Sequence, residues 1–403
     1  MVKHAGPGLQ AALLTGATGG SQAMVALAYV LCARAASPES FGYVASAIGL
    51  GMAMIGIVDF GANSFWMRSL ANGAMTLSDA ARRAFWKSVT AVLLALIILA
   101  VTSLASVPSE FLAAAPVFLA MTLAQLAQVP LRAAARSDLV AIALVVSRIF
   151  MFVVLLLLLV ANVDATVALW ASLSLGAFSE SFLYLMFTPR VQRFALNDYR
   201  FINPWQGSTN FGVYSIATSF QSLDVSLVTS FAGAPAGGSY AAVNRWTQPL
   251  GLAVTGFTSA AAPFIARAET FREGWQVIRR AWWMLWVALS ACVFAFVLAP
   301  IIVPILLGAA YEDSVLVFQI MALGTIPALL TQPLAVFSQM RGADRSVGIL
   351  TACGIAVRLA ATAVLAAGLG AVGGALAYAL AQALLVVALG TVFVRAVRNE
   401  PRE

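Results

Sequence analysis

The amino-acid sequence predicts an all-α, polytopic membrane protein with about 12 transmembrane helices in two six-helix lobes. Hydrophobic residues make up 62% of the 403 residues and charged residues only 10%, whereas ordinary soluble domains carry about 25% charged residues. Apolar runs long enough to span ~30 Å of hydrocarbon recur along the whole chain. Lys and Arg occur at alternate breaks between these runs, as in multi-pass membrane proteins.

The predicted membrane spans are separated by short polar breaks. The first run is too long for the core of a signal peptide and eleven more follow it, so we expect a retained membrane helix. The twelve predicted spans are 9–33, 42–66, 87–107, 111–131, 139–161, 166–187, 208–231, 239–263, 281–303, 314–338, 347–367 and 372–394.

The charges of the breaks predict that both termini are cytoplasmic, because cytoplasmic loops retain Lys and Arg. The net charge of +7 therefore reflects membrane topology and gives no reason to expect nucleic-acid binding. The intervening breaks hold Glu39, Glu110, Asp164, Glu312 and Asp313. The basic residues of the cytoplasmic set are Lys3, Arg68, Arg82, Arg83, Lys87, Arg132, Arg136, Arg190, Arg193, Arg200, Arg267, Arg272, Arg279, Arg280, Arg341, Arg345, Arg395, Arg398 and Arg402.

Seven charged residues remain inside the predicted spans or at their outer ends. A charge at bilayer depth costs about 2.5–3.5 kcal/mol even on the lenient insertion scale, so it normally faces the bundle interior or a wet cavity. A structural ion pair is the alternative for each one. The excess of arginine over acid favours a water-filled path for an anionic substrate. The seven residues are Arg34, Arg148, Arg245, Arg358, Asp59, Glu180 and Asp224.

Internal repeats predict that the two halves of the chain are copies. LRAAARS at 131–137 matches MRGADRS at 340–346, and each is followed by a span with an arginine in its middle, Arg148 or Arg358. A weaker match joins FGYVAS at 41–46 and GSYAAV at 238–243. Because each copy has six spans, the lobes are expected to be related by an axis along the membrane normal. The expected boundaries are 1–190 for the first lobe, 191–207 for a cytoplasmic linker, 208–394 for the second lobe and 395–403 for a cytoplasmic tail.

Polar residues form stripes on several predicted spans, and such stripes line a lumen or form hydrogen bonds between helices. The span 208–231 carries four of them at helical spacing. Small residues form another stripe on 42–66, which indicates close helix packing. The predicted cavity-lining polar residues are Gln22, Asn210, Tyr214, Gln221, Asn244 and Gln248, and the small residues are Gly42, Ser46, Gly49, Ala53 and Gly56.

Two hypotheses concern the buried charges. Arg148 and Arg358 are expected at equivalent depths and could share a diphosphate, since guanidinium groups bind phosphate in bidentate fashion. Asp224 lies on the polar stripe of its span and must be neutralised beside an anionic substrate. It either pairs with an arginine, for which Arg245 is the first choice, or binds a proton or Na⁺ whose release is coupled to transport.

A family resemblance is carried by five segments, at 41–71, 222–250, 262–267, 306–324 and 370–382. Together they resemble the bacterial polysaccharide flippases, members of the multidrug/oligosaccharidyl-lipid/polysaccharide exporter superfamily. The resemblance covers the whole chain and implies a multi-pass protein of the bacterial inner membrane. It implies transport of a polyprenyl-diphosphate-linked oligosaccharide from the inner to the outer leaflet, alongside a polysaccharide polymerase and a chain-length regulator. It also implies that Arg34, Arg148, Arg245 and Arg358 handle the anionic head group.

Two other functional classes stay open. A drug/cation antiporter of the same superfamily would need acids to dominate the lumen, whereas four arginines face three acids here. A polysaccharide polymerase or ligase is the weakest alternative, because every predicted external loop is short. We therefore expect no enzyme, metal or cofactor. The GxGxxG at Gly368, Gly370 and Gly373 follows no strand, so it is expected to form a turn between spans.

Overall fold

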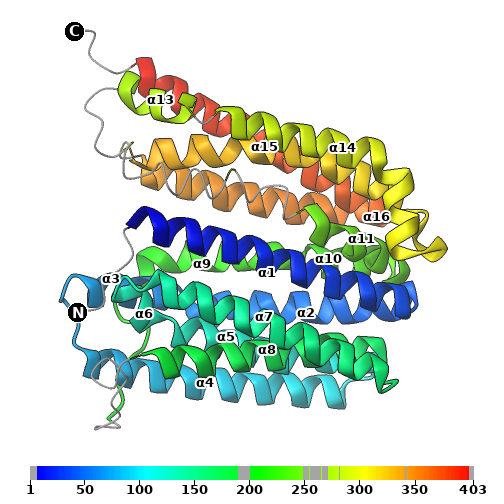
Figure 1. Cartoon of the computed structure of the whole chain (residues 1–403), viewed down its shortest axis with the longest axis horizontal. Coiled ribbons are helices and arrows are strands. Elements are labelled where there is room, and N and C mark those ends of the chain that lie inside the picture. The colour runs from blue at the N-terminus through cyan, green and yellow to red at the C-terminus, as the bar shows by residue number, and fades with distance from the viewer. Residues whose placement is uncertain are drawn as a thin grey trace.

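The computed structural model describes residues 7–188, 200–247, 254, 265, 271–280, 282–340 and 343–398, and in these residues every regular element is a helix (Figure 1). Among them, nine helical stretches are long and apolar enough to cross a membrane, and one of the nine contains two of the predicted spans. The all-α membrane architecture is confirmed. The number twelve and the division into two lobes remain predictions.

The first half of the chain folds into eight α-helices and one short 3-10 helix. Each predicted span up to residue 187 corresponds to one helix or to two or three consecutive helices. The elements are α1 (Pro7–Ala35), α2 (Pro38–Asp59), α3 (Ala62–Ala71), α4 (Leu77–Leu104), η1 (Ser109–Ala113), α5 (Ala114–Ala127), α6 (Val129–Ala133), α7 (Ser137–Val160) and α8 (Ala165–Phe187).

The second half contains more interruptions. The span predicted at 208–231 is bent by a 3-10 turn, and the span predicted at 239–263 is described as a helix only to residue 247. Gly370, with φ 61° and ψ −140°, breaks the last long helix between two predicted spans, as the glycine motif indicated. The elements are α9 (Thr209–Phe220), η3 (Gln221–Leu223), α10 (Asp224–Ala232), α11 (Ala234–Thr247), α13 (Phe271–Arg280), α14 (Trp282–Leu307), η5 (Ala309–Tyr311), α15 (Ser314–Met340) and α16 (Asp344–Arg398).

The helices run roughly parallel, so their connections gather at two ends of the molecule (Figure 1). One end holds α3, α6, α13 and the end of α16, and with them Arg68, Arg83, Arg132 and Arg279; we call it the basic end. The opposite end holds the start of α2 with Glu39 and the start of α15. The expected segregation of loop charge is therefore present in three dimensions.

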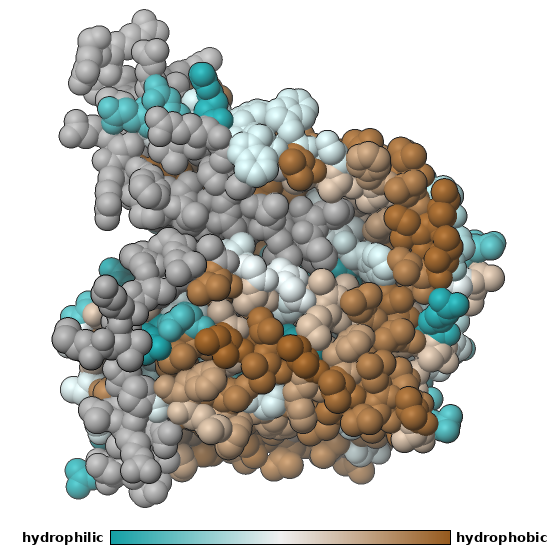
Figure 2. Space-filling model, viewed as in Figure 1, coloured by the Kyte–Doolittle hydropathy of each residue, from teal (hydrophilic) through white to brown (hydrophobic). Residues whose placement is uncertain are grey.

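Large apolar side chains cover the outside of the bundle (Figure 2). On α4, Leu93, Leu96 and Val101 are 55%, 56% and 59% exposed, and on α14 Phe294 is 65% exposed. Such a surface is unfavourable in water, and monomeric soluble proteins rarely expose large contiguous apolar patches. A lipid environment accounts for it.

The small-residue stripe of α2 packs against helices of the second half, which confirms the close packing expected from the sequence. A Cβ added at Gly42 would lie 2.0 Å from the carbonyl oxygen of Ala234, and one at Gly49 would lie 2.5 Å from that of Ser222. On the α11 side, a Cβ at Gly238 would lie 1.9 Å from the carbonyl oxygen of Pro38. Backbone therefore meets backbone along this contact, which we call the glycine seam.

Gly238→Ala should open the glycine seam at the α2 start. The added carbon meets a backbone oxygen that cannot rotate away, and overpacking of this kind costs about 1–3 kcal/mol. The expected result is a lower melting temperature of the purified protein in detergent. Gly20→Ala is the matched control, because a Cβ at Gly20 has nothing within 4 Å. An equal melting temperature for both variants would show that α2 and α11 lie farther apart.

The predicted span 42–66 is wrong as a single helix, since α2 ends at Asp59 and the chain turns before α3. Phe60 and Gly61 have φ of 42° and 70°, and the Phe60 N–H donates to the Gly56 carbonyl. The Asp59 carboxylate accepts the N–H of Asn63 and so caps α3. A left-handed pair followed by a side-chain cap ends one helix and starts another.

Lys87 was assigned to a cytoplasmic loop, and that assignment is wrong. Its ammonium is fully buried, lies 2.5 Å from Asp59 and 2.8 Å from the Asn63 amide oxygen, and stands over the Trp66 ring. Ser215 of α9 donates to the other Asp59 oxygen at 3.1 Å. The charge faces inward because the α2–α3 break presents a buried carboxylate to α4.

Lys87→Met should destabilise the protein by about 3–5 kcal/mol, because removing one partner leaves the buried Asp59 carboxylate without a cation. The double variant Lys87→Met/Asp59→Asn should recover most of that loss. Thermal melting in detergent measures both. Arg82→Gln is the control, since the pair that Arg82 forms with Asp79 is partly exposed, and such pairs contribute about 0–1 kcal/mol. If the double variant melts no higher than Lys87→Met, the two charges are not coupled.

Candidate functional site

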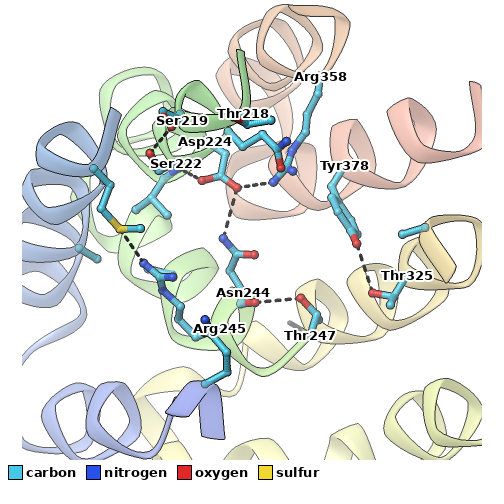
Figure 3. Close-up of a pocket in the computed structure, with 18 of the residues that line it drawn as sticks. Thr218, Ser219, Ser222, Asp224, Asn244, Arg245, Thr247, Thr325, Arg358 and Tyr378 are labelled. Carbon is cyan, nitrogen blue, oxygen red and sulfur yellow. Dashed lines mark hydrogen bonds and ion pairs between the residues drawn. The ribbon is translucent and has the colours of Figure 1, made fainter. Parts of the chain in front are cut away.

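A central cavity of about 550 Å³ lies between the two halves of the chain. Residues from α1, α2, α5, α9, η3, α10, α11, α15 and α16 line it. Its charged residues are Asp224, Arg245 and Arg358 (Figure 3). Its amide side chains are Gln22, Gln125, Gln221, Asn244, Gln332 and Gln382.

Asp224 is buried at the first position of α10, with 3% of its surface exposed. Its Oδ2 forms an ion pair with the Arg358 guanidinium, and the Tyr240 hydroxyl donates to the same oxygen at 3.0 Å. Asn244 donates its amide at 3.2 Å, and the Val225 N–H donates to Oδ1 at 2.7 Å. Four donors therefore satisfy this carboxylate, and one of them carries a positive charge.

The expected partner of Asp224 was Arg245, and the structure places Arg358 there instead. α10 packs against α16, so the middle of α16 comes to the carboxylate. Arg245 lies on the adjacent α11, but its side chain points away from Asp224 (Figure 3), and its Nη2 lies near the Met52 sulfur. Sequence spacing placed the two groups at similar depth but could not give the direction of either side chain.

Arg358 is itself buried, with 8% of its surface exposed. Its guanidinium carbon stands 4.8 Å from the centre of the Tyr378 ring, and its Nε has no hydrogen-bond partner in the described residues. Arg358 also lines the cavity. Its guanidinium therefore both forms a fixed ion pair with Asp224 and faces the cavity.

Arg245 is half-buried and has no carboxylate partner among the described residues. Its guanidinium stands 4.9 Å from the centre of the Tyr29 ring, with Nη2 3.4 Å from the Tyr29 hydroxyl and 3.6 Å from the Met52 sulfur. A cation on an aromatic face is held without being neutralised. Asp224 and Arg358 offset each other, so Arg245 leaves the cavity with a net positive charge.

Arg148 lies outside the cavity lining and does not contact Arg358. Its Nη2 is 3.3 Å from Glu180, its Nε donates to Ser21 at 2.9 Å, and Tyr184 donates to Glu180 at 2.8 Å. This cluster joins α1, α7 and α8. The expected meeting of the two repeat arginines across the cavity is therefore absent from the described structure, because Arg148 faces α8 of its own half.

The other expected site residues divide by location. Gln22, Gln221 and Asn244 line the cavity, whereas Tyr214 is 52% exposed and does not appear in the lining of the described residues. Arg34 is exposed at the end opposite the basic end and donates to the Ile305 carbonyl at 3.1 Å. Gln248 and the side chain of Asn210 lie outside the described residues.

Sequence reasoning missed three tyrosines of the site. Tyr29 and Tyr378 stand against Arg245 and Arg358, and Tyr240 donates to Asp224. Each lies in an apolar helix, where a tyrosine side chain is expected simply to pack against its neighbours. It also missed Gln125, Gln332 and Gln382, which line the cavity from α5, α15 and α16. Their signal is a polar side chain opposite the lipid-facing side, and this is visible only when the exposed side is known.

The cavity is closed toward the end opposite the basic end. Phe41 stacks edge-on against Tyr29 at 5.9 Å and against Tyr311 at 6.5 Å, which joins α1, α2 and η5. The glycine seam joins α2 to α11 at the same level. All three aromatic side chains are buried, so closure at this end is a packed core.

No family profile and no curated protein matches the chain. Solved structures do match. The lipid II flippase MurJ in an inward closed conformation aligns with TM-score 0.73 at 13% identity, covering 97% of this chain and 94% of that one. An inward-facing multidrug resistance MATE transporter of the MOP superfamily aligns with TM-score 0.69 at 14% identity, covering 94% and 96%. The chain has the fold of the MOP-superfamily transporters.

A third match adds a point about polarity within the MOP fold. A MOP-superfamily transporter from Pyrococcus furiosus, for which a reverse polarity of the binding pocket is said to suggest a different function, aligns with TM-score 0.56 at 14% identity, covering 98% and 97%. At these identities the likeness shows the fold alone. The specific resemblance to polysaccharide flippases is therefore weighed on the residues of the cavity.

Proposed function

We propose that this protein is a flippase that moves a polyprenyl-diphosphate-linked oligosaccharide from the inner to the outer leaflet through the central cavity. The observation that carries the proposal is Arg245, a cavity arginine without a carboxylate partner among the described residues. An arginine held only by an aromatic ring and weak acceptors can bind the phosphate oxygens of an anionic head group.

The remaining lining fits the other parts of such a substrate. Amide side chains donate and accept hydrogen bonds, so the glutamines of the lining can bind sugar hydroxyls of varied orientation. The cavity volume of about 550 Å³ suits a head group with a few sugars. The polyprenyl chain remains in the surrounding lipid, beside the apolar outer surface.

Alternating access follows from where the cavity is closed. In our proposal the basic end is cytoplasmic, the lobes 1–190 and 208–394 rock about the cavity, and this conformation receives substrate from the inner leaflet. Closure by the glycine seam and by Phe41 at the opposite end supports this assignment. The likeness to inward-facing and inward closed MOP structures is consistent with it.

A drug/cation antiporter is the second candidate, because the matched structures include multidrug transporters and Asp224 is a carboxylate at the cavity wall. Ion coupling through Asp224 would require a proton or Na⁺ to replace a donor. The Arg358 guanidinium already neutralises this group, which favours the flippase. Arg358 thus supplies internally the positive charge that a coupling ion would bring.

Reconstitution tests the two candidates directly. Proteoliposomes would contain purified protein and a fluorescent polyprenyl-diphosphate-linked saccharide, and a membrane-impermeant quencher would report the fraction in the outer leaflet. If the protein is a flippase, the quenchable fraction should appear at least about twice as fast in these proteoliposomes as in empty liposomes. Uptake of ethidium under a proton or Na⁺ gradient, without saccharide transfer, would instead establish the antiporter.

Thiol labelling tests the orientation. In a variant with Cys32, Cys292 and Cys353 replaced, cysteines at the exposed Ser109 and Glu312 should react with an impermeant reagent added to intact cells. A cysteine at the exposed Ser78 should react only after the membrane is opened, because its loop belongs to the basic end. Labelling of Ser78 alone in intact cells would reverse the topology.

A further inference from the structure

A second pocket lies at the basic end and shares no lining residue with the central cavity. Its volume is about 580 Å³, and its walls come from α3, the turn into α4, the first turns of α4 and the segment that leads into α9. Phe65, Met75 and Phe211 give it an apolar wall. Its polar residues are Arg68, Ser69, Asn72, Asp79 and Arg83.

The two arginines of this pocket have guanidinium groups available to a ligand. Arg68 is exposed, and no hydrogen bond or ion pair ties its side chain to any described residue. Arg83 donates Nη1 to the Gln206 carbonyl at 2.8 Å, while its Nε is buried and has no partner among the described residues. A buried N–H donor without an acceptor costs free energy, so a ligand that brings an acceptor to the Arg83 Nε is favoured.

The carboxylate of the pocket, Asp79, already has partners of its own. Asp79 lies 2.5 Å from Arg82 and accepts a hydrogen bond from the Thr76 hydroxyl at 2.8 Å. It forms no direct ion pair with Arg68 or Arg83, although its charge acts on Arg83 at longer range. Among the described residues, the pocket combines two guanidinium groups that lack a direct carboxylate contact with an apolar wall, at the level where a membrane surface would meet the bundle.

We propose that this pocket binds a phosphate group, carried either by an anionic lipid of the adjoining leaflet or by a soluble phosphate compound. Guanidinium groups recognise phosphate oxygens through paired N–H donors. The apolar wall of Phe65 and Phe211 would contact the part of the ligand next to the phosphate. The binding site is independent of the transport proposal, although naming the leaflet relies on the proposed orientation.

Binding there would connect the two halves of the chain. Arg68 and Arg83 belong to α3 and α4, whereas the opposite wall, with Gly207 and Phe211, leads into α9 of the cavity. Gly207 has φ 89°, and a Cβ on it would lie 2.6 Å from the Phe65 ring, so this segment is seated closely. A bound phosphate group would hold α9 against α3 and α4, and so stabilise the observed arrangement.

Thermal melting of the full-length protein in neutral detergent tests the site. One arm titrates pyrophosphate against sodium chloride of equal ionic strength, and the other titrates dioctanoyl phosphatidylglycerol against dioctanoyl phosphatidylcholine. We expect a saturable rise in melting temperature in at least one arm. Arg68→Gln and Arg83→Gln should each weaken the apparent affinity by about tenfold or more, as expected for a lost hydrogen bond to a charged group.

Arg132→Gln is the matched control, because Arg132 is an exposed arginine of the same end outside the pocket. A rise with pyrophosphate identifies a soluble ligand, and a rise with phosphatidylglycerol alone identifies a lipid. Equal loss in Arg132→Gln, or no saturable rise in either arm, would overturn the site. Arg245→Ala should keep the rise, which separates failure of this site from failure of the transport proposal.

Discussion

Arg358→Met should lower the stability of the purified protein by about 3–5 kcal/mol, the range for removing one partner of a buried ion pair. The Asp224 carboxylate would keep Tyr240 and Asn244 as donors but lose its only cation. Asp224→Asn should also destabilise, because it leaves the Arg358 guanidinium buried without a counter-charge. The double variant Asp224→Asn/Arg358→Gln should recover most of either loss, and thermal melting in detergent measures the cycle.

The same cycle with Arg245 is the control. Asp224→Asn/Arg245→Gln should melt no higher than Asp224→Asn alone, because Arg245 does not contact Asp224. Rescue by Arg245→Gln and not by Arg358→Gln would restore the pairing expected from the sequence. A wild-type melting temperature for Asp224→Asn would reject both pairings.

Arg245→Ala should reduce polysaccharide export by at least about tenfold, as expected when a hydrogen bond to a charged group is lost, while the protein level stays normal. No buried carboxylate is left behind by this change, so the loss falls on substrate binding and not on folding. Arg245→Lys should restore export only in part, because an ammonium lacks the planar donor fork that binds phosphate in bidentate fashion. Complementation of an export-deficient strain, normalised to membrane protein level, gives the measurement.

Arg148→Ala is the comparison for this result. Arg148 pairs with Glu180 away from the cavity, so its loss should lower the amount of folded protein more than the export per molecule. Export at the wild-type rate in Arg245→Ala would contradict the proposed role of that arginine. A loss of export per molecule in Arg148→Ala would return Arg148 to the transport path.

Composition and periodicity predicted most of the fold, because span length and loop charge are properties of the membrane rather than of packing. The break after Asp59 was not predictable in the same way. Phe60 in the left-handed region is unusual for a bulky residue, and the polar and glycine residues beside it, Asp59, Gly61 and Asn63, are the sequence signal of a turn that the single-span prediction overlooked. The buried partner of Asp59 at this break is Lys87, which is distant in sequence and resembles a loop charge.

The sequence predicted the kind of site, a cationic cavity, but not which charged residues pair with each other. The excess of intramembrane arginine indicated a cationic cavity, and Arg245 and Arg358 do line it. Spacing along one helix gives a face, but the partner of Asp224 depends on which helix packs beside α10. Arg148 and Arg358 occupy matching places in the repeat, yet one faces a helix of its own half and the other reaches the cavity.

The glycine seam has a consequence for how substrate selectivity can vary among related proteins. Gly49 lies on the cavity wall, but any side chain there would collide with the Ser222 carbonyl. This position of α2 therefore cannot acquire a new recognition group by a single substitution. Under the proposed function, diversification toward different glycans would use other side chains of the lining, among them Gln125, Gln332 and Gln382.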